Sequence, residues 1–340
     1  MKKITLKEIA QTLGISISTV SKALKDYPDV SVSTKQKVVD LAQTLNFSPN
    51  SFAQSLRSKE SKTIGVIVPN MVHYYFSSIL DAILKESNKK GYMVIIMQSN
   101  EDHKLEEKQI NLLLNKGVDG ILISMANGSI NFEYLQRVLD FGIPLVLFDK
   151  ITKLLKCSKV IINDNKASYD VVTYLIKNGY KRIAYFRGDL NPQNSIDRFL
   201  GYKKALEDNG IQFDSSLVYL SPKANFEEGY ANAKKLFEED QIDVDAIYTI
   251  TDLTAVGVIT YLNEKNIKIP DEIAVFGFSN WFMSSVITPT LSTVEQNAYK
   301  TGEKAVELLF KEIDSKQKGE PFKERTITID TELVIRNSTW

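Results

Sequence analysis

The chain of 340 residues contains one cysteine, Cys157. One cysteine excludes an intramolecular disulfide, and its scarcity fits a reducing compartment. No apolar run approaches the ~20 residues that a membrane-spanning helix needs. The lysines near the amino terminus are not followed by the apolar segment of a secretory signal. The sequence therefore predicts a cytoplasmic protein.

Histidine is also scarce, because His73 and His103 are the only two. Neither lies beside a cysteine or an acidic cluster in the pattern of a catalytic triad or metal site. The acids before His103, Glu101 and Asp102, fit the solvated start of a charged helix, and Cys157 has no paired base nearby. The phosphate-binding patterns GxxxxGK[ST] and GxGxxG are absent. We therefore expect no enzyme activity, no metal and no cofactor.

The chain has no net charge, yet its charge is unevenly distributed. Residues 1–62 carry ten Lys or Arg and five acids, so this segment is +5 and the remainder is −5. A basic head on an acidic body suits a module that neutralises DNA phosphates. At this length two or three domains are expected.

Residues 5–24 read as two short helices joined by a tight turn, the layout of a helix-turn-helix DNA reader. Thr5 and Glu8 form a capping box, and Gly14 stands where a positive φ is needed. Ser16 is a good N-cap for the second helix, which is expected to bury Val20 and Leu24. Any small three-helix bundle shares such features, so this pattern alone also fits a bundle that does not bind DNA.

A third helix follows, with Ser33 and Gln36 as a second predicted capping box and an apolar face from Val38 to Leu45. A polar stretch, residues 46–62, then precedes an abrupt strand at Thr63–Asn70.

From residue 63 onward, short apolar runs alternate with amphipathic stretches. The predicted strands are Ile64–Val68, Met93–Met97, Gly120–Ser124, Leu145–Phe148, Lys159–Ile162, Ile183–Phe186, Ala246–Thr249 and Ile273–Phe276. The predicted helices are Phe76–Lys89, Leu105–Asn115, Phe132–Phe141, Lys166–Asn178, Ser195–Asn209, Phe226–Glu239, Asp252–Lys265 and Ala298–Ile313. This alternation predicts an α/β body of two doubly wound lobes with parallel sheets.

Ligands of such sheets bind beyond the carboxyl ends of the strands. Polar and aromatic residues gather there, as in a sugar or nucleoside pocket: Asn70, Tyr74, Tyr75, Phe76, Asn100, Asp149, Asp164, Arg187, Arg198, Thr251, Asp252, Ser279 and Asn280. Individually, these residues also admit structural explanations. Asp164, Asp252 and Ser195 fit simple helix N-caps, and Arg198 fits a surface ion pair.

The motifs together resemble the lactose-repressor/galactose-repressor (LacI/GalR) family of transcriptional regulators over nearly the whole chain. The resemblance is carried by residues 5–24, the hinge-like segment 46–57, the strand 63–70, Gly201-Tyr202, the strand end 275–277 and the tail 332–336.

That resemblance implies an all-α helix-turn-helix head at 1–45, a hinge helix or linker at 46–62, and a two-lobed body at 63–340 with a periplasmic-binding-protein-like fold. Lobe 1 would hold about 63–162 and 294–322, and lobe 2 about 163–293 and 323–340. Three crossovers would link the lobes. The helix at Ala298–Ile313 would return to the first lobe, and the strands around Thr326–Ile335 would close the second.

The resemblance also implies DNA contacts in the head. Ile17, Ser18 and Lys22 match positions that touch base edges in the major groove. Lysine at the last of these lacks the arginine fork that the family often has. The positions that hold phosphates match five residues with hydroxyl groups: Ser16, Thr19, Ser21, Ser31 and Thr34. Thr5 and Leu6 complete the set of expected DNA contacts in the head, which is Thr5, Leu6, Ser16, Ile17, Ser18, Thr19, Ser21, Lys22, Ser31 and Thr34.

The hinge carries a second expected readout. Asn50, Ala53 and Leu56 lie at i, i+3 and i+6 of a short helix, and Leu56 matches the residue that wedges between base pairs in the minor groove. The alternative is a plain linker, which Pro49 and the neighbouring serines allow.

The positions that contact effectors in the family match Tyr75, Phe76, Asp149, Asn194, Arg198, Phe226, Thr251 and Ser279. Ser279 replaces an acid that is common in the family, and Thr251 replaces an asparagine. Trp281 is a further ring that could face the ligand or pack between the lobes. The expected effector is a sugar or sugar derivative.

The implied function is that of a sequence-specific regulator, more often a repressor, that binds palindromic operator DNA as a homodimer and responds to a small molecule. The outer face of the helix at Phe76–Lys89 is the expected dimer contact. The alternative is a sugar-binding protein of a transport or sensing system, which would share the two-lobed body but would lack a basic head.

Overall fold

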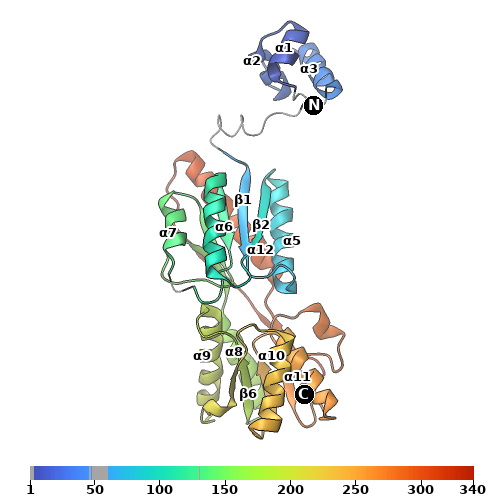
Figure 1. Cartoon of the computed structure of the whole chain (residues 1–340), viewed down its shortest axis with the longest axis vertical. Coiled ribbons are helices and arrows are strands. Elements are labelled where there is room, and N and C mark those ends of the chain that lie inside the picture. Colours follow the sequence, from blue (N-terminus) through green and yellow to red (C-terminus); the bar gives the residue numbers. More distant parts are fainter. Residues whose placement is uncertain (1–3, 46, 48–59, 130) are drawn as a thin grey trace. The chain divides into compact units, whose positions relative to one another are not determined.

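The computed structural model describes residues 4–45, 47, 60–129 and 131–340 (Figure 1). The chain divides into two compact units, Met1–Ser61 and Lys62–Trp340. Each unit has its own hydrophobic core.

The first unit contains three helices, α1 (Leu6–Leu13), α2 (Ile17–Leu24) and α3 (Val32–Thr44). The predicted capping box is present: the Thr5 hydroxyl accepts from the Glu8 amide, and the Glu8 carboxylate accepts from the Thr5 amide. Gly14 ends α1 with a φ of 63°, which glycine adopts without strain. These local features turn α2 against α1 and α3.

Two details of the head differ from prediction. Ser31, not Ser33, caps α3, and its hydroxyl accepts from the Thr34 amide at 3.2 Å. Gln36 donates instead to Asp40, so the second capping box is wrong. In α2 the fully buried residues are Val20 and Ala23, whereas Leu24 is half-buried at the core's edge.

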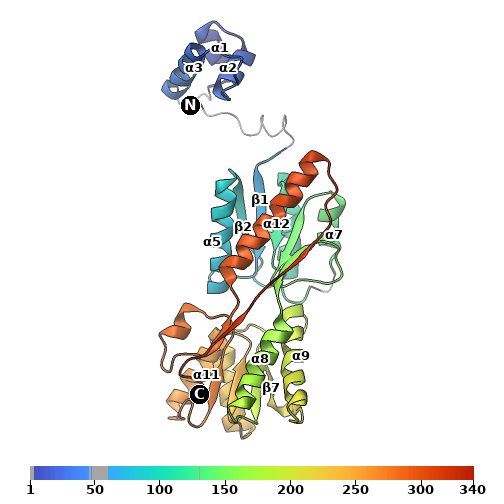
Figure 2. The same ribbon diagram turned by 180° about the vertical axis from the view of Figure 1, so that it is seen from behind.

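The first lobe of the second unit is built on a six-stranded sheet in the order β11-β5-β4-β3-β1-β2, with every neighbouring pair parallel. Its strands are β1 (Thr63–Val68), β2 (Met93–Gln98), β3 (Gly120–Ile123), β4 (Leu145–Phe148), β5 (Ser158–Ile162) and β11 (Thr326–Ile329). One face is covered by α5 (Tyr74–Lys89) and α12 (Ala298–Lys318), and the other by α6 (His103–Lys116) and α7 (Glu133–Asp140), as Figures 1 and 2 show from opposite sides.

The second lobe has a four-stranded parallel sheet in the order β7-β6-β8-β9. Its strands are β6 (Ile183–Arg187), β7 (Val218–Leu220), β8 (Ala246–Thr249) and β9 (Ala274–Phe276). The helices α8 (Asp164–Lys177) and α9 (Gln193–Asp208) cover one face. The other face is covered by α10 (Phe226–Lys234), which continues as a π-helical turn at Lys235–Glu239, and by α11 (Asp252–Glu264). Short 3-10 turns lie at Ser215–Leu217 and Phe282–Ser285.

Close helix packing in both lobes depends on glycine. A Cβ on Gly201 of α9 would lie 2.2 Å from the Asn165 carbonyl oxygen of α8. A Cβ on Gly302 of α12 would lie 2.4 Å from the Ile79 carbonyl oxygen of α5. Only glycine permits such backbone approach.

The chain passes between the lobes three times. It enters lobe 2 after β5, returns through β10 (Thr293–Glu295) to α12, and leaves again through β12 (Glu332–Val334). Strands β10 and β12 pair antiparallel to form a two-stranded ribbon. The tail then lies beside β9, where the Val275 amide donates to the Ser338 carbonyl oxygen at 2.9 Å.

This topology corrects the predicted lobe boundaries. Strand β11 was expected to close the second lobe, but it pairs with β5 at the edge of the first sheet. Residues 323–329 therefore belong with lobe 1, because the run after α12 stays beside β5 before it crosses. Within the described residues, no helix has the length and apolarity required to cross a membrane.

Candidate functional site

The exposed face of α2 lies opposite its buried residues. Ile17 is 48% exposed although it is a large apolar residue, and Ser18 and Lys22 are exposed beside it. Ser21 is half-buried. Helical periodicity separates this face from Val20 and Ala23, which pack into the core. The helix thus presents one apolar side chain, hydroxyls and an ammonium to its surroundings.

Serine hydroxyls cap both α2 and α3. The Ser16 hydroxyl accepts from the Thr19 amide at 3.1 Å and shares hydrogen bonds with the Ser18 and Thr19 hydroxyls. The Ser31 hydroxyl shares one with Thr34 at 2.8 Å. A helix start with further unpaired amides and hydroxyls can hold a phosphate oxygen.

The Lys22 ammonium is hydrogen-bonded to the Asp29 carboxylate, on the segment between α2 and α3. This bond lowers the pKa of Asp29. Both side chains are about half exposed, so the pair is solvent-screened and separable.

The other predicted DNA-contact residues divide between two places. Thr5 is exposed and caps α1, whereas Leu6 is half-buried against the core of the head. The hinge residues Asn50, Ala53 and Leu56 lie outside the described residues.

In the second unit, Arg198 of α9 joins several elements around the carboxyl ends of the lobe 2 strands. Its Nε donates to Asp164 Oδ1 at 2.7 Å, its Nη1 to the Ile250 carbonyl oxygen at 2.9 Å, and its Nη2 to Gln296 Oε1 at 3.4 Å. The guanidinium carbon lies 3.6 Å from the centroid of the Phe278 ring. Arg198 is 4% exposed, so the surface ion pair proposed from sequence is wrong.

Ser279 is connected to Arg198 through one residue. Gln296 Nε2 donates to the Ser279 hydroxyl at 2.8 Å, while its Oε1 accepts from Arg198. Ser279 has a φ of 124°, a strained value for a residue with a side chain. The loop after β9 is thereby held against the arginine.

The N-cap explanations for three residues are also wrong. Asn163 caps α8 and Thr251 caps α11, so Asp164 and Asp252 are the first residues of these helices and not their caps. Asp252 Oδ2 accepts from the Trp281 amide and the Ser284 hydroxyl, each at 2.7 Å, so this carboxylate anchors the 3-10 turn. Ser195 lies inside α9, and Trp281 is half-buried.

The lobe 1 side brings together Tyr75, Phe76 and Asp149. The two rings are buried and meet edge to face with centroids 5.4 Å apart. Asp149 Oδ2 accepts from the Ser124 hydroxyl at 3.2 Å, and Asp149 has a φ of 57° at the end of β4. Burial raises the pKa of Asp149, and that of the Tyr75 hydroxyl well above its ordinary value.

Electrostatics indicate that this wall faces the arginine cluster. The pKa of Tyr75 is raised further by Asp149 and Asp164 and lowered by Arg198. The nearby His73 side chain has its pKa lowered to about 4 by burial, with the Lys150 charge adding to the effect. At neutral pH the Tyr75 hydroxyl and the His73 imidazole are therefore uncharged.

The remaining predicted effector residues lie at the starts of lobe 2 helices. Thr251 caps α11 and donates to the Ala224 carbonyl oxygen at 3.0 Å. Phe226 begins α10, two residues further along, and is half-buried. Asn194, in the first turn of α9, accepts from the Ser195 amide at 2.8 Å.

A recess of about 230 Å³ lies between the lobes and was not identified from sequence. Its lining comes from the loops after β3 and β4 and from the start of α9: Met125, Ala126, Gly128, Ser129, Phe132, Lys150, Ile151, Thr152, Lys153, Leu154, Asn191, Pro192 and Gln193. Lys150 links Glu101 to the Asn127 side chain, and Asn127 Nδ2 reaches the Pro222 carbonyl oxygen of lobe 2 at 3.3 Å. The one sequence signal for these residues was their position just after strands.

A buried carboxyl holds the same loop from behind. Glu106 of α6 accepts from the Ala126 amide at 2.6 Å and from the Tyr134 hydroxyl. Burial raises the pKa of Glu106 to about 7. Across the described ranges, no group of His, Cys, Asp and Glu side chains is arranged to hold a metal ion.

Residues 5–50 match the family described as "Bacterial regulatory proteins, lacI family", and residues 61–336 match "Periplasmic binding proteins and sugar binding domain of LacI family". The chain is 30% identical to the HTH-type transcriptional regulator RegA of Clostridium saccharobutylicum, over 98% of this chain and 99% of RegA. It is also 30% identical to the HTH-type transcriptional repressor PurR of Histophilus somni (strain 2336), over 98% of each chain. A structure of the lac repressor dimer bound to operator and the anti-inducer ONPF has a TM-score of 0.87 at 23% identity, with 99% of each chain covered.

Proposed function

Because the chain belongs to the LacI family of bacterial transcriptional regulators, we propose that it represses transcription by binding a palindromic operator as a homodimer. It is a DNA-binding regulator and not an enzyme. We propose residues 1–45 as the reading head, 46–62 as the hinge and 63–340 as the body. The observation that carries the proposal is the exposed face of α2, where an apolar side chain is left uncovered beside hydroxyls and an ammonium.

In this proposal α2 enters the major groove. Ile17 offers apolar contact to a thymine methyl, and Ser18 and Lys22 offer hydrogen bonds to base edges. The caps Ser16 and Ser31, with Thr19, Ser21 and Thr34, hold phosphates, which fix the orientation of the helix without reading sequence. Lys22 must leave Asp29 to reach a base.

The hinge contributes a minor-groove contact in the same proposal. A short polar segment does not form a helix alone, so it would fold when two hinges meet on DNA. Leu56 would then separate two base pairs at a cost of about a few kcal/mol, offset by the contacts that bent DNA permits. Leu56→Ala should weaken operator binding strongly while leaving the thermal unfolding of the body unchanged.

The effector is proposed to bind between the lobes and to be a sugar or sugar derivative. The support is the facing arrangement of Tyr75, Phe76 and Asp149 with the Arg198 cluster. Three donors of Arg198 are occupied by protein, which leaves other N–H groups of its guanidinium for ligand hydroxyls. A ligand that prefers one lobe–lobe arrangement would shift the population of hinge-competent dimers.

The alternative, a sugar-binding protein of a transport system, requires only the body. The match of residues 5–50 to a regulatory family favours the regulator, since such a head has no use in transport.

The test is selection of binding sequences from a randomised duplex pool with the full-length chain. We expect recovered sequences to be inverted repeats and their affinity to fall steeply with salt, because phosphate contacts release counterions. Ile17→Ala should relax base preference within the half-site, whereas the matched change Ile211→Ala, in the body, should not. Absence of salt-sensitive binding with or without candidate sugars would refute the proposal.

The effector is tested separately by thermal unfolding of the full chain in the presence of mono- and oligosaccharides and nucleosides. A ligand that raises the unfolding temperature should lose its effect in Asp149→Asn and Phe76→Ala. A ligand whose shift survives both changes binds elsewhere.

A further inference from the structure

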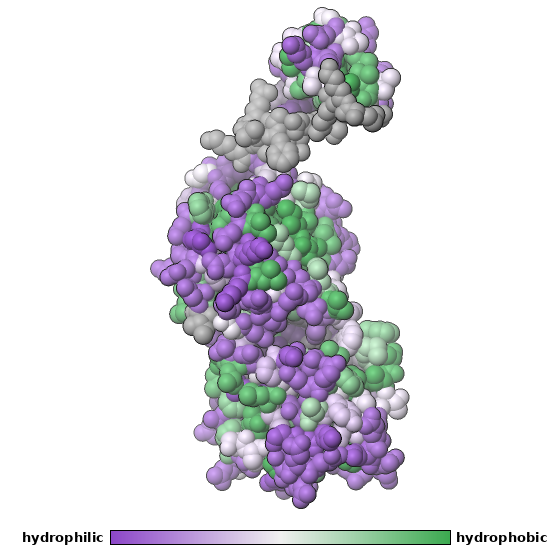
Figure 3. Space-filling view, in the orientation of Figure 1, coloured by the Kyte–Doolittle hydropathy of each residue, from purple (hydrophilic) through white to green (hydrophobic). Residues whose placement is uncertain are grey.

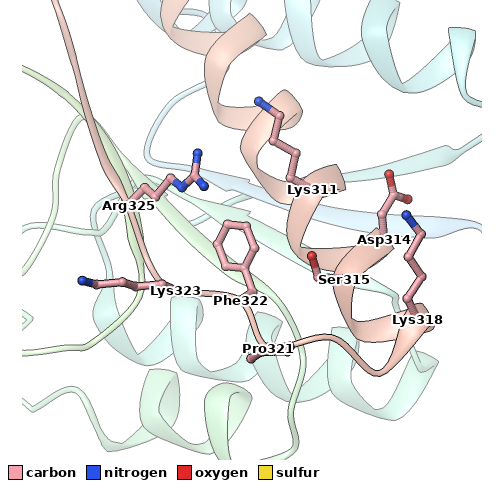
Figure 4. Close-up of a pocket in the computed structure, with 8 residues that line it drawn as sticks. All are labelled: Lys311, Asp314, Ser315, Lys318, Pro321, Phe322, Lys323 and Arg325. Carbon is pink, nitrogen blue, oxygen red and sulfur yellow. The ribbon is translucent and has the colours of Figure 1, made fainter.

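Lobe 1 contains a second recess of about 490 Å³ (Figure 4). It lies between the last turns of α12 and the segment that leads into β11. Its lining residues are Lys311, Asp314, Ser315, Lys318, Pro321, Phe322, Lys323 and Arg325.

The backbone shapes this recess. Gly319 ends α12 with a φ of 69°, and the Glu320 amide donates back to the Ser315 carbonyl oxygen at 2.9 Å, so the chain reverses sharply. The Arg325 amide then donates to the Ser158 hydroxyl at 3.1 Å and its carbonyl oxygen accepts from the Lys159 amide at 2.8 Å. Both walls are therefore fixed by hydrogen bonds.

The charge of the lining is strongly one-sided. Four of its residues are cations: Lys311, Lys318, Lys323 and Arg325. Among the ion pairs of the described residues, none includes these four cations. The one carboxylate in the lining, Asp314, faces Lys90 at 3.9 Å. The four cations outnumber this one carboxylate, so they repel one another, and a concave surface concentrates their field on an incoming anion.

An aromatic wall accompanies the cations. Phe322 is half-buried, and the Arg325 guanidinium carbon lies 5.9 Å from its ring centroid. Figure 4 shows the ring turned toward α12, with Ser315 on the opposite wall and Arg325 beside it. A flat apolar face next to cations and a hydroxyl suits a ligand with both a ring and an anionic group.

We infer that this recess binds a phosphomonoester carried on a ring, such as a sugar phosphate or a nucleotide. The phosphate lies between Lys311 and Arg325, and the ring packs on Phe322. The volume suits one small molecule. The recess adjoins the first residues of β5 and β11, so it lies at the amino-terminal edge of the parallel sheet, whereas the effector residues lie at the carboxyl-terminal edge.

Titration calorimetry of the full-length chain tests this inference with glucose 6-phosphate, AMP and inorganic phosphate as probes, and with glucose and adenosine as uncharged references. We expect at least one phosphomonoester to bind more tightly than both inorganic phosphate and its uncharged reference. The double variant Lys311→Gln/Arg325→Gln should lower that affinity by about tenfold or more, which corresponds to ~1.4 kcal/mol or more. Lys108→Gln, an exposed cation of α6, should not change it.

Phe322→Leu separates the two parts of the ligand. It should weaken binding of the phosphomonoester and leave binding of inorganic phosphate unchanged, because only the phosphomonoester has a ring that packs on Phe322. Thermal unfolding of each variant confirms that it is folded, and an Asp149→Asn variant, altered in the cleft, should retain phosphomonoester binding.

The inference would be overturned if neither phosphomonoester bound, if binding were indifferent to Lys311→Gln/Arg325→Gln, or if binding were lost in Asp149→Asn. If the double variant lost only its binding to non-operator duplex DNA, the cations would be assigned to DNA phosphates. That outcome would also refute a small-molecule site.

Discussion

Arg198 Nε and Asp164 Oδ1 lie 2.7 Å apart, and both side chains are more than nine-tenths buried. The bond joins α9 to the first residue of α8. A buried pair of this kind contributes little net stability, but removal of one partner leaves an uncompensated buried charge. Arg198 therefore has a structural role whether or not it touches a ligand.

Burial raises the pKa of Asp164, so the pair is compared at pH 8, where this carboxyl is ionised. At that pH Asp164→Asn should lower the free energy of unfolding of the body by about 3–5 kcal/mol, because it leaves the Arg198 guanidinium buried without its counter-ion. Urea denaturation of the wild type and the variant measures this. An unchanged transition would show that the guanidinium finds another anion. A loss of effector binding in Arg198→Ala must be compared with that in Asp164→Asn, because both changes break the same buried pair.

The Glu106 carboxyl should make stability depend on pH. Its pKa in the folded chain is about 7, above the ordinary 4.5, so the folded state holds its proton longer than the unfolded state. The stabilisation is complete below pH 4.5 and is lost as the pH rises through 7. Glu106→Gln should remove this dependence, which amounts to at most about 3 kcal/mol.

Urea denaturation at pH 5 and pH 8 gives the change in the free energy of unfolding between the two pH values. The prediction is checked by comparing this change in the wild type with that in Glu106→Gln. Burial also raises the pKa values of Glu312 and Asp164 to about 7, and these two carboxyls give a similar pH dependence in both proteins, which cancels in that comparison. Identical pH dependence in the wild type and Glu106→Gln would refute it.

Asp29→Asn should strengthen DNA binding. The change frees the Lys22 ammonium from its partner and removes a negative charge from the head. Because the pair is exposed, the gain should be modest, roughly two- to fivefold in affinity. Fluorescence anisotropy with a selected operator measures it, with Asp40→Asn on α3 as a control for the charge alone. Equal gains from the two changes would mean that the Lys22 pair is irrelevant.

The contact between Asn127 and the Pro222 carbonyl oxygen should favour the arrangement of the lobes seen here. Lys153 and Asp197 face each other across the same boundary at 3.7 Å. If the effector prefers this arrangement of the lobes, Asn127→Ala combined with Asp197→Asn should weaken effector binding by roughly two- to fivefold, because the two changes lower the population of that arrangement. Calorimetry with the identified effector measures the loss, and Asn209→Ala, at the C-cap of α9, should cause none.

The sequence was most informative where local chemistry decides the structure. The Thr5–Glu8 capping box, the turn at Gly14 and the alternation of strands and helices each depend on neighbours in the chain, and all are confirmed. Of the three-residue strands described, β9 was predicted, but β7 and β10 were missed and β12 was merged with its neighbour, because runs this short carry little periodicity.

Long-range pairing could not be predicted from the sequence alone. Thr326–Ile329 has the same apolar alternation whether it pairs in one lobe or the other, and only the fold assigns it to β5. The roles of Asp164 and Asp252 were misjudged because Asn163 and Thr251, each one residue earlier, are equally good caps. Arg198 was identified as important, but its buried partners lie 34, 52 and 98 residues away.

The position of β11 bears on how the chain is made. Lobe 1 begins at Thr63, yet its edge strand ends at Ile329, so a ribosome must synthesise nearly the whole protein before that sheet is complete. The head emerges early and is a separate compact unit. A nascent or prematurely terminated chain would therefore carry a finished head on an unfinished body, and translation through β11 marks the point after which ligand control becomes available.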